Sequence, residues 1–375
     1  MPNNLNIVLQ NNTDSHEVWA YITGIALQGQ HANQRCLLKA NGKDLYIPQN
    51  PPAIGSPLTE DCAIPLSGPG EPGVNVTIPQ IAGGRIWIAR DNKLTFLLNP
   101  GPALVEPSVL NPSDPNADVD FAFCEFTLND AQLYANISYV DFVPRLPVAI
   151  QLKTSHGPEQ VVAGMKADGL ETLAAGLREQ ATKDGRPWDK LIVEHEGKAF
   201  RILNSTHGDA VGASFNGYYE PYVEKVWQAL SQHSNVKINT QAAAGTLAAK
   251  IHNDKLLVGE EEFVKPTTAD IFGCNSGPFT TGPSPTRNAI IPRLAAAFVR
   301  SSLLEGDGAQ PSAPDTYYKT DPTQHYARLV HEVNIDRKGY AFAYDDVQPD
   351  GGEDQSGKVN AGDPVLFTVT VGGPR

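Results

Sequence analysis

The sequence is poor in cysteine and in basic residues, and it has no long apolar run. Its four cysteines, at 36, 62, 124 and 274, form no Cys-x-x-Cys pair, so neither a zinc ribbon nor a thioredoxin-type motif is supported. Lys and Arg total 29 against 42 Asp and Glu, for a formal net charge of −13. This balance argues against nucleic acid or an anionic membrane surface as a partner. No stretch has the length and apolarity of a transmembrane helix.

The beginning of the sequence lacks the pattern of a signal peptide. Met-Pro-Asn-Asn-Leu-Asn-Ile-Val-Leu has no basic segment followed by an apolar one, so no signal is expected in the sequence as given. Three localisations stay open: intracellular, exported by an unconventional route, or secreted with the signal already removed. Sequons at Asn11, Asn75, Asn136 and Asn204 would permit glycosylation in a secreted protein.

What the sequence does contain is turn-rich and moderately apolar. There are 33 Gly and 30 Pro among 375 residues, and 41% of the chain is hydrophobic. Such a composition is typical of many short strands and turns rather than of a helical repeat or a disordered chain. The length favours two lobes over a single core.

The periodicity of apolar residues changes along the chain. Period-two patterns predict strands at 5–10, 17–23, 85–90, 94–98 and 148–152. Helical spacing predicts amphipathic helices around 170–181, 222–230 and 290–298, with strands between them. Strand-like patterns return at 327–333, 340–344 and 365–371. We therefore expect a β lobe from 1–155 and 320–375, and a mixed α/β lobe from 156–319.

The most informative segment is a predicted hairpin over 118–143. One face of its first strand begins apolar and then turns polar, and its members in order are Val119, Phe121, Phe123, Glu125, Thr127 and Asn129. The returning strand places Ile137, Tyr139 and Asp141 on one face. With a turn near 129–132, the pairing is expected to bring Glu125 close to Tyr139 and Asp141.

Two neighbouring carboxylates are the minimum needed to hydrolyse a glycosidic bond. One carboxyl protonates the leaving oxygen, while the other activates water or attacks the anomeric carbon. This chemistry needs no metal and no cofactor. The alternative is that Glu125 and Asp141 are ordinary carboxylates at the rim of a half-solvated sheet, and their spacing alone does not decide between the two interpretations.

This segment resembles the β-1,3-glucanases of glycoside hydrolase family 64, whose barrel is similar to thaumatin. In that family a glutamate is the general acid and an aspartate the general base, separated as Glu125 and Asp141 are. The resemblance implies glucan contacts at four further positions: Thr127, Asn129, Tyr134 and Ser138. The last two depart from the tryptophan and threonine of the family. Stretches 83–87, 273–279 and 339–347 are similar to the fungal branch.

The resemblance implies a mostly β fold with an α/β part. A thaumatin-like β-barrel or sandwich lobe would face the mixed α/β lobe across a wide groove. It further implies an endo-type, inverting hydrolase of β-1,3-glucan, such as laminarin, curdlan or fungal cell-wall glucan, that releases short laminari-oligosaccharides. We expect a monomer without cofactor or metal. The alternative is a non-catalytic thaumatin-like β-glucan-binding protein.

Other polar groups are weaker candidates. Tyr344, Asp345 and Asp346 either line the groove or form a solvated acidic turn. The loop that follows lacks the glutamate that a calcium-binding EF-hand loop needs at its twelfth position. His325 and His331 are the closest suggestive histidine pair, but there is no His-Glu-x-x-His motif for a zinc hydrolase. The Gly-x-Ser-x-Gly motif of serine hydrolases is also absent.

Overall fold

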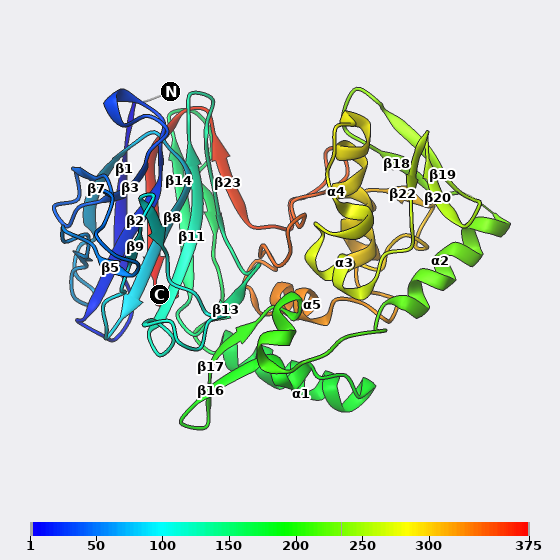
Figure 1. The fold of residues 1–375 in the computed structure, drawn as a ribbon, viewed down its shortest axis with the longest axis horizontal. Helices are drawn as coiled ribbons and strands as arrows, with labels where there is room; N and C mark the ends of the chain where they lie inside the picture. The colour runs from blue at the N-terminus through cyan, green and yellow to red at the C-terminus, as the bar shows by residue number, and fades with distance from the viewer. Residues whose placement is uncertain (1–2, 234, 374–375) are drawn as a thin grey trace.

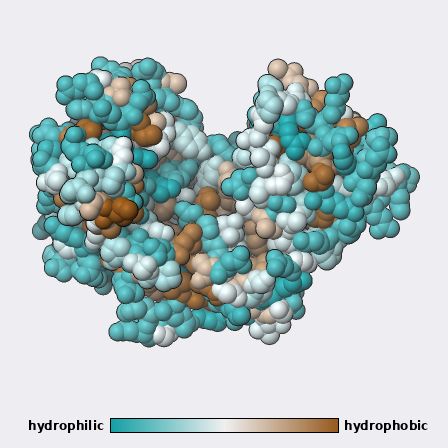
Figure 2. All heavy atoms as spheres, viewed as in Figure 1, coloured by the Kyte–Doolittle hydropathy of each residue, from teal (hydrophilic) through white to brown (hydrophobic). Residues whose placement is uncertain are grey.

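The computed structural model describes residues 3–233 and 235–373, which form two lobes that meet at a common base (Figure 1). One lobe consists almost entirely of strands, and the other combines helices with a small sheet. The space-filling view shows the surface hollowed between the two lobes (Figure 2). The exact division into 1–155 with 320–375 and 156–319 stays a prediction.

The β lobe is built from two large sheets packed face to face, with a smaller sheet beside them. The five-stranded sheet has the order β15 (Gln160–Val162), β14 (Val148–Thr154), β24 (Pro364–Val371), β1 (Asn4–Asn11) and β7 (Val74–Pro79). The larger sheet has the order β23 (Lys358–Ala361), β12 (Leu133–Ile137), β11 (Asp120–Leu128), β8 (Ile81–Arg90), β2 (Val18–Ala26), β3 (Arg35–Leu38) and β4 (Leu45–Tyr46), with β6 (Ile64–Pro65) on β2. The smaller sheet has the order β10 (Ala103–Val105), β9 (Leu97–Asn99) and β5 (Ser56–Pro57).

The last strand of the chain lies inside the first sheet. β24 pairs in parallel with β1, with Phe367 opposite Ile7, and antiparallel with β14 on its other side. The strand predicted at 365–371 is therefore present. Within the described residues the strand orders of both large sheets run from edge to edge without closing, so this lobe is a sandwich of mixed, open sheets rather than a closed barrel.

The larger sheet is apolar on both faces for part of its length. Side chains such as Ile86 and Cys124 point into the main core between the two sheets. Trp87, Phe121 and Phe123 point the other way into a second, aromatic cluster. The ring centroids of Trp87 and Phe123 are 5.0 Å apart. Strands β8 and β11 are therefore packed on both faces as far as Trp87 and Phe123. Beyond these residues the face with the aromatic cluster becomes polar.

The remaining elements form the base and the α/β lobe. One small sheet has the order β13 (Phe142–Pro144), β17 (Lys198–Leu203) and β16 (Ile192–His195). The sheet of the α/β lobe has the order β21 (Glu261–Phe263), β20 (Lys255–Val258), β19 (Thr246–His252), β18 (Lys237–Asn239) and β22 (Ala309–Gln310). The helices are α1 (Gly169–Asp184), α2 (Glu220–Gln232), α3 (Thr268–Gly273), α4 (Pro285–Val299) and α5 (His325–Val333).

The helix signals in the sequence explain where several helices begin and end. Helix α1 ends at Gly185, whose φ of 68° is in the left-handed region that glycine adopts easily. Helix α4 begins after Ser284, whose side chain accepts a hydrogen bond from the backbone N–H of Arg287. The helices predicted from periodicity in α1, α2 and α4 are all present. Among the described residues, no helix combines the length and apolarity needed to cross a membrane.

Two of the predicted late strands are wrong. Residues 327–333 belong to helix α5, in which Tyr326, Leu329, Val330 and Val333 are buried. These buried residues are three or four apart, which is helical spacing. Ala327, Leu329 and Val333 also fit a period of two, and this second pattern favours a strand. Residues 340–344 form a turn beyond a single bridge from Tyr340 to Ser138.

Candidate active site

Glu125 lies on β11 directly beyond the aromatic cluster. Phe121 and Phe123 on the same face of this strand are buried, whereas Glu125 and Thr127 are partly exposed. The prediction that one face of the strand turns from apolar to polar is therefore confirmed. Because the strand is packed on both sides up to Phe123, the Glu125 side chain leaves a rigid support.

The register of the hairpin differs from the predicted one. A hydrogen bond closes a tight turn over 129–132, and this places Asn136 directly opposite Glu125. The expectation that strand pairing brings Tyr139 and Asp141 beside Glu125 is wrong, because β12 ends before both residues. Tyr139 instead packs in the main core.

Arg85 on the neighbouring strand β8 is shared by two carboxylates. Its Nε donates to Oε1 of Glu125 at 3.1 Å, and its Nη1 lies 3.4 Å from Oε2 of Glu106. The guanidinium carbon lies 4.9 Å from the centre of the Phe123 ring, so the cation rests on the aromatic cluster. Glu106 also accepts a hydrogen bond of 2.8 Å from the Thr23 hydroxyl.

Asp141 lies in the bend before β13 and contacts a histidine from a distant segment. Oδ1 of Asp141 is 3.0 Å from Nε2 of His207, and the backbone carbonyl of Asp141 accepts from Asn204 at 2.9 Å. The hydrogen bond from His207 lowers the pKa of Asp141; burial opposes this, and the charges of His207 and Arg85 add to it. Asp141 is therefore an ionised carboxylate within electrostatic range of the same guanidinium that holds Glu125.

A cavity of about 400 Å³ opens beside Glu125. Its lining residues are Arg35, Gly83, Gly84, Arg85, Glu106, Glu125, Phe126, Thr127, Tyr134 and Asn136. Thr127 and Tyr134 face each other across the hairpin. The buried Oδ1 of Asn136 has no hydrogen-bond partner among the residues that the structure describes, so it can accept a hydrogen bond from a bound hydroxyl group.

Two of the predicted glucan contacts lie outside this cavity. The side-chain oxygen of Asn129 accepts hydrogen bonds from the backbone of Ala131 and Gln132, and so stabilises the hairpin turn. Ser138 is buried just after β12, in a bridge with Tyr340. The structure thus brings together Glu125, Thr127 and Tyr134, while Asn129 and Ser138 lie at the two ends of β12.

Several residues of the site did not stand out in the sequence. Two of them could have been found from period two. Arg85 lies two residues before Trp87 and so on the same face of β8, and Asn136 lies two residues after Tyr134 on the same face of β12. Glu106 and His207 carry no local signal, since each reaches the site from a segment far away in the sequence. The arrangement offers one ionised carboxylate, a second carboxyl bound to a shared arginine, and a polar cavity open to solvent.

Comparison with known proteins connects this geometry to one family. The family model of the β-1,3-glucanases of glycoside hydrolase family 64 matches residues 3–371. A glucan endo-1,3-β-glucosidase of Cellulosimicrobium cellulans is 30% identical over 291 residues, which cover 73% of this chain and 50% of that protein. The chain therefore spans about half the length of the curated relatives it matches.

Solved structures agree with this assignment along the whole chain. A laminaripentaose-producing β-1,3-glucanase in complex with laminaritetraose is similar with a TM-score of 0.84 and 27% identity, over 99% of both chains. A β-1,3-glucanase domain from Clostridium beijerinckii shares the fold, with a TM-score of 0.73 over 98% of both chains and 20% identity. This chain belongs to glycoside hydrolase family 64, the β-1,3-glucanase family.

Proposed function

We propose that the chain is an endo-type β-1,3-glucanase that inverts the anomeric carbon, with Glu125 as general acid and Asp141 as general base. Membership of the family supports the reaction class. The observation that carries the roles is the difference between the two carboxyl groups: Asp141 is held ionised by His207, whereas Glu125 shares a single cation with Glu106.

Asp141 suits the role of base. A general base must be ionised when water arrives, and the hydrogen bond from His207 lowers the pKa of Asp141. That bond uses Oδ1, so Oδ2 is the oxygen that takes the proton from the attacking water. The water then adds to the face of the sugar opposite the leaving oxygen.

Glu125 suits the role of acid. Glu125 and Glu106 share the guanidinium of Arg85, so the three groups carry one net negative charge when both carboxyls are ionised. The Glu125 carboxyl extends from the supported strand β11 into the cavity that is open to solvent, where a glycosidic oxygen could reach it. In the proposed reaction Glu125, in its protonated form, donates a proton to the glycosidic oxygen as the bond breaks.

The cavity and the surrounding hollow provide the binding surface of the proposal. Tyr134 would stack on a pyranose ring, and Thr127 would hydrogen-bond to sugar hydroxyls, with Asn129 and Ser138 at the ends of the same strand. The chain would act as a monomer on laminarin, curdlan or fungal cell-wall glucan and release short laminari-oligosaccharides. A long polymer fits the open hollow between the lobes (Figure 2).

The test is turnover of linear β-1,3-glucan by the wild type, Glu125→Gln and Asp141→Asn. Loss of an acid or a base lowers the rate by about 100- to 10,000-fold. Glu17→Gln is the matched control, because Glu17 lies on the β lobe without an ion pair among the described residues, and it keeps the wild-type rate. If the wild type binds glucan without releasing products, the chain is a glucan-binding protein and the proposal fails.

A further inference from the structure

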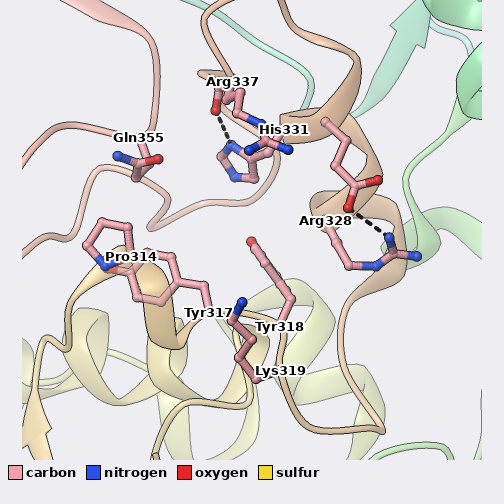
Figure 3. Close-up of a pocket in the computed structure, with 9 residues that line it drawn as sticks. Pro314, Tyr317, Tyr318, Lys319, Arg328, His331, Arg337 and Gln355 are labelled. Carbon is pink, nitrogen blue, oxygen red and sulfur yellow. Dashed lines mark hydrogen bonds and ion pairs between the residues drawn. The ribbon is translucent and has the colours of Figure 1, made fainter. Parts of the chain in front are cut away.

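A second cavity lies beside helix α5 and shares no lining residue with the cavity beside Glu125. It has a volume of about 250 Å³ and is formed by three segments: residues 314–319, helix α5 with the turn after it, and the loop at Gln355 (Figure 3). Nothing in the proposed glucanase reaction uses this cavity. Its chemistry also differs from that of the site around Glu125.

The wall of this cavity is basic in a chain of net charge −13. Lys319, Arg328, Arg337 and His331 face a single carboxylate, Glu332. Arg328 is paired with Glu332 at 2.9 Å. In the part of the chain that the structure describes, neither Lys319 nor Arg337 has a carboxylate within ion-pair distance. Two positive charges at the cavity are therefore uncompensated.

His331 links this wall to a buried carboxylate. Its Nε2 is 3.0 Å from Oδ2 of Asp345, and its Nδ1 is 3.2 Å from the backbone carbonyl of Arg337. A carboxylate and a carbonyl can only accept, so in each of these contacts the ring nitrogen is the donor. Asp345 is fully buried and is also bound to Arg300 at 3.0 Å. The single carboxylate behind this wall is thus shared by Arg300 and His331.

Tyr318 provides an unused donor. Its hydroxyl is buried, and Arg300 is close enough to donate to the hydroxyl oxygen. The hydroxyl proton has no acceptor within hydrogen-bond distance among the described residues. Figure 3 shows this hydroxyl pointing into the cavity, toward His331 and Arg337. A buried hydroxyl proton without an acceptor costs free energy, which a bound acceptor would recover. The donor and the positive charges converge on one space.

We propose that this cavity binds a small oxyanion, a phosphate group, free or as a small phosphomonoester. Arginine and lysine side chains bind the phosphate oxygens, and the Tyr318 hydroxyl donates to one of them. A neutral sugar fits less well, because the wall carries uncompensated positive charge and the ring of Tyr317 already holds the Arg300 guanidinium at 4.1 Å. The volume suits a ligand smaller than the drug-sized molecules that fill pockets of roughly 300–1,000 Å³.

The anion would join parts of the chain that belong to different lobes. Residues 314–319 follow the last strand of the α/β lobe, while Gln355 precedes β23, which pairs with β12 beside Glu125. The backbone carbonyl of Gln355 accepts from Gly339, in the turn after α5. A ligand held by all three segments stabilises their arrangement, so it raises the melting temperature in proportion to the logarithm of its concentration.

The experiment measures binding of inorganic phosphate and of glucose 6-phosphate to the full chain by calorimetry, with sodium chloride holding the ionic strength constant. The variants are Arg337→Gln, Lys319→Gln and Tyr318→Phe, the last of which removes only the hydroxyl group. Lys43→Gln is the control of equal charge, because Lys43 is an exposed lysine without an ion pair in the described residues. Melting curves without ligand show that each variant is folded.

We expect one saturable site whose affinity falls about tenfold in Arg337→Gln and Lys319→Gln, the effect of losing one charge-assisted hydrogen bond. The affinity should fall less in Tyr318→Phe and stay unchanged in Lys43→Gln. Tighter binding of glucose 6-phosphate than of phosphate identifies a phosphomonoester as the ligand, and equal binding identifies free phosphate. No saturable binding of either probe, or an equal loss in Lys43→Gln, overturns the proposal. These outcomes do not depend on glucanase activity.

Discussion

The Nε2 atom of His207 lies 3.0 Å from Oδ1 of Asp141, and this hydrogen bond is the main cause of the lowered pKa of that carboxyl. Because a carboxylate only accepts, Nε2 must carry the proton. His207 reaches Asp141 from the short 3-10 helix Ser205–Val211 that follows β17, a segment with no motif of its own. In the proposed reaction it is a positioning residue, which fixes the base and keeps it ionised without touching the sugar.

Replacement of His207 should shift the pH dependence of the reaction. The base works while it is ionised, so activity is lost as the pH falls through the pKa of Asp141. Removal of the hydrogen bond in His207→Ala raises that pKa, and the acidic limb of the kcat profile moves to higher pH. His207→Gln, which can still donate, should shift the limb less. Equal profiles in all three proteins would contradict the role of His207.

The aromatic cluster under β11 should contribute to the stability of the β lobe. Phe123 is buried and lies under the Arg85 guanidinium. Phe123→Ala should cost about 3–5 kcal/mol of the free energy of unfolding, through lost burial and the cavity left behind. Ile54→Ala, at a side chain that is 82% exposed, should change it by less than about 0.5 kcal/mol. Urea unfolding of the two variants measures the difference, and equal costs would contradict the packing described.

The buried ion cluster at Asp345 predicts an acid-dependent stability. Burial alone would raise the pKa of Asp345, but His331 and Arg300 outweigh it and lower the pKa. The stability from these contacts is therefore present above the ordinary carboxyl pKa of about 3.9 and is lost as the pH falls through the lower folded-state value.

Asp345→Asn should remove this acid dependence and cost about 3–5 kcal/mol near neutral pH, because Arg300 stays buried without its partner. The surface pair of Lys338 with Glu353 is the matched comparison, and Glu353→Gln should cost less than about 1 kcal/mol. Unfolding free energies measured across the acid range test both statements. An unchanged acid dependence in Asp345→Asn would show that other carboxyls control it.

The sequence predicted well what depends on local alternation. The two faces of β11, the apolar support at Phe123 and the polar end at Glu125 follow from period two, and the helices of the α/β lobe follow from their apolar stripes. The strand predicted at 327–333 is part of helix α5, because a short apolar run satisfies both periods and only its packing decides between them.

Contacts between residues far apart in the sequence could not be predicted from local alternation. The contact between Asp141 and His207 depends on how β13 and β17 pair, and the contact between Arg85 and Glu106 depends on the path of a loop. The register of the hairpin was within reach of the sequence. A tight turn at 129–132 places Asn136, not Tyr139, opposite Glu125.

The configuration of the first product tests the central claim most directly. Linear β-1,3-glucan is given to the wild-type chain, and the anomeric protons of the released oligosaccharides are followed by NMR from the earliest turnover. With Glu125 as acid and Asp141 as base for water, the account predicts α-anomers first, followed by mutarotation. If β-anomers are released first, the reaction retains configuration, and the assignment of Asp141 as a base for water is wrong.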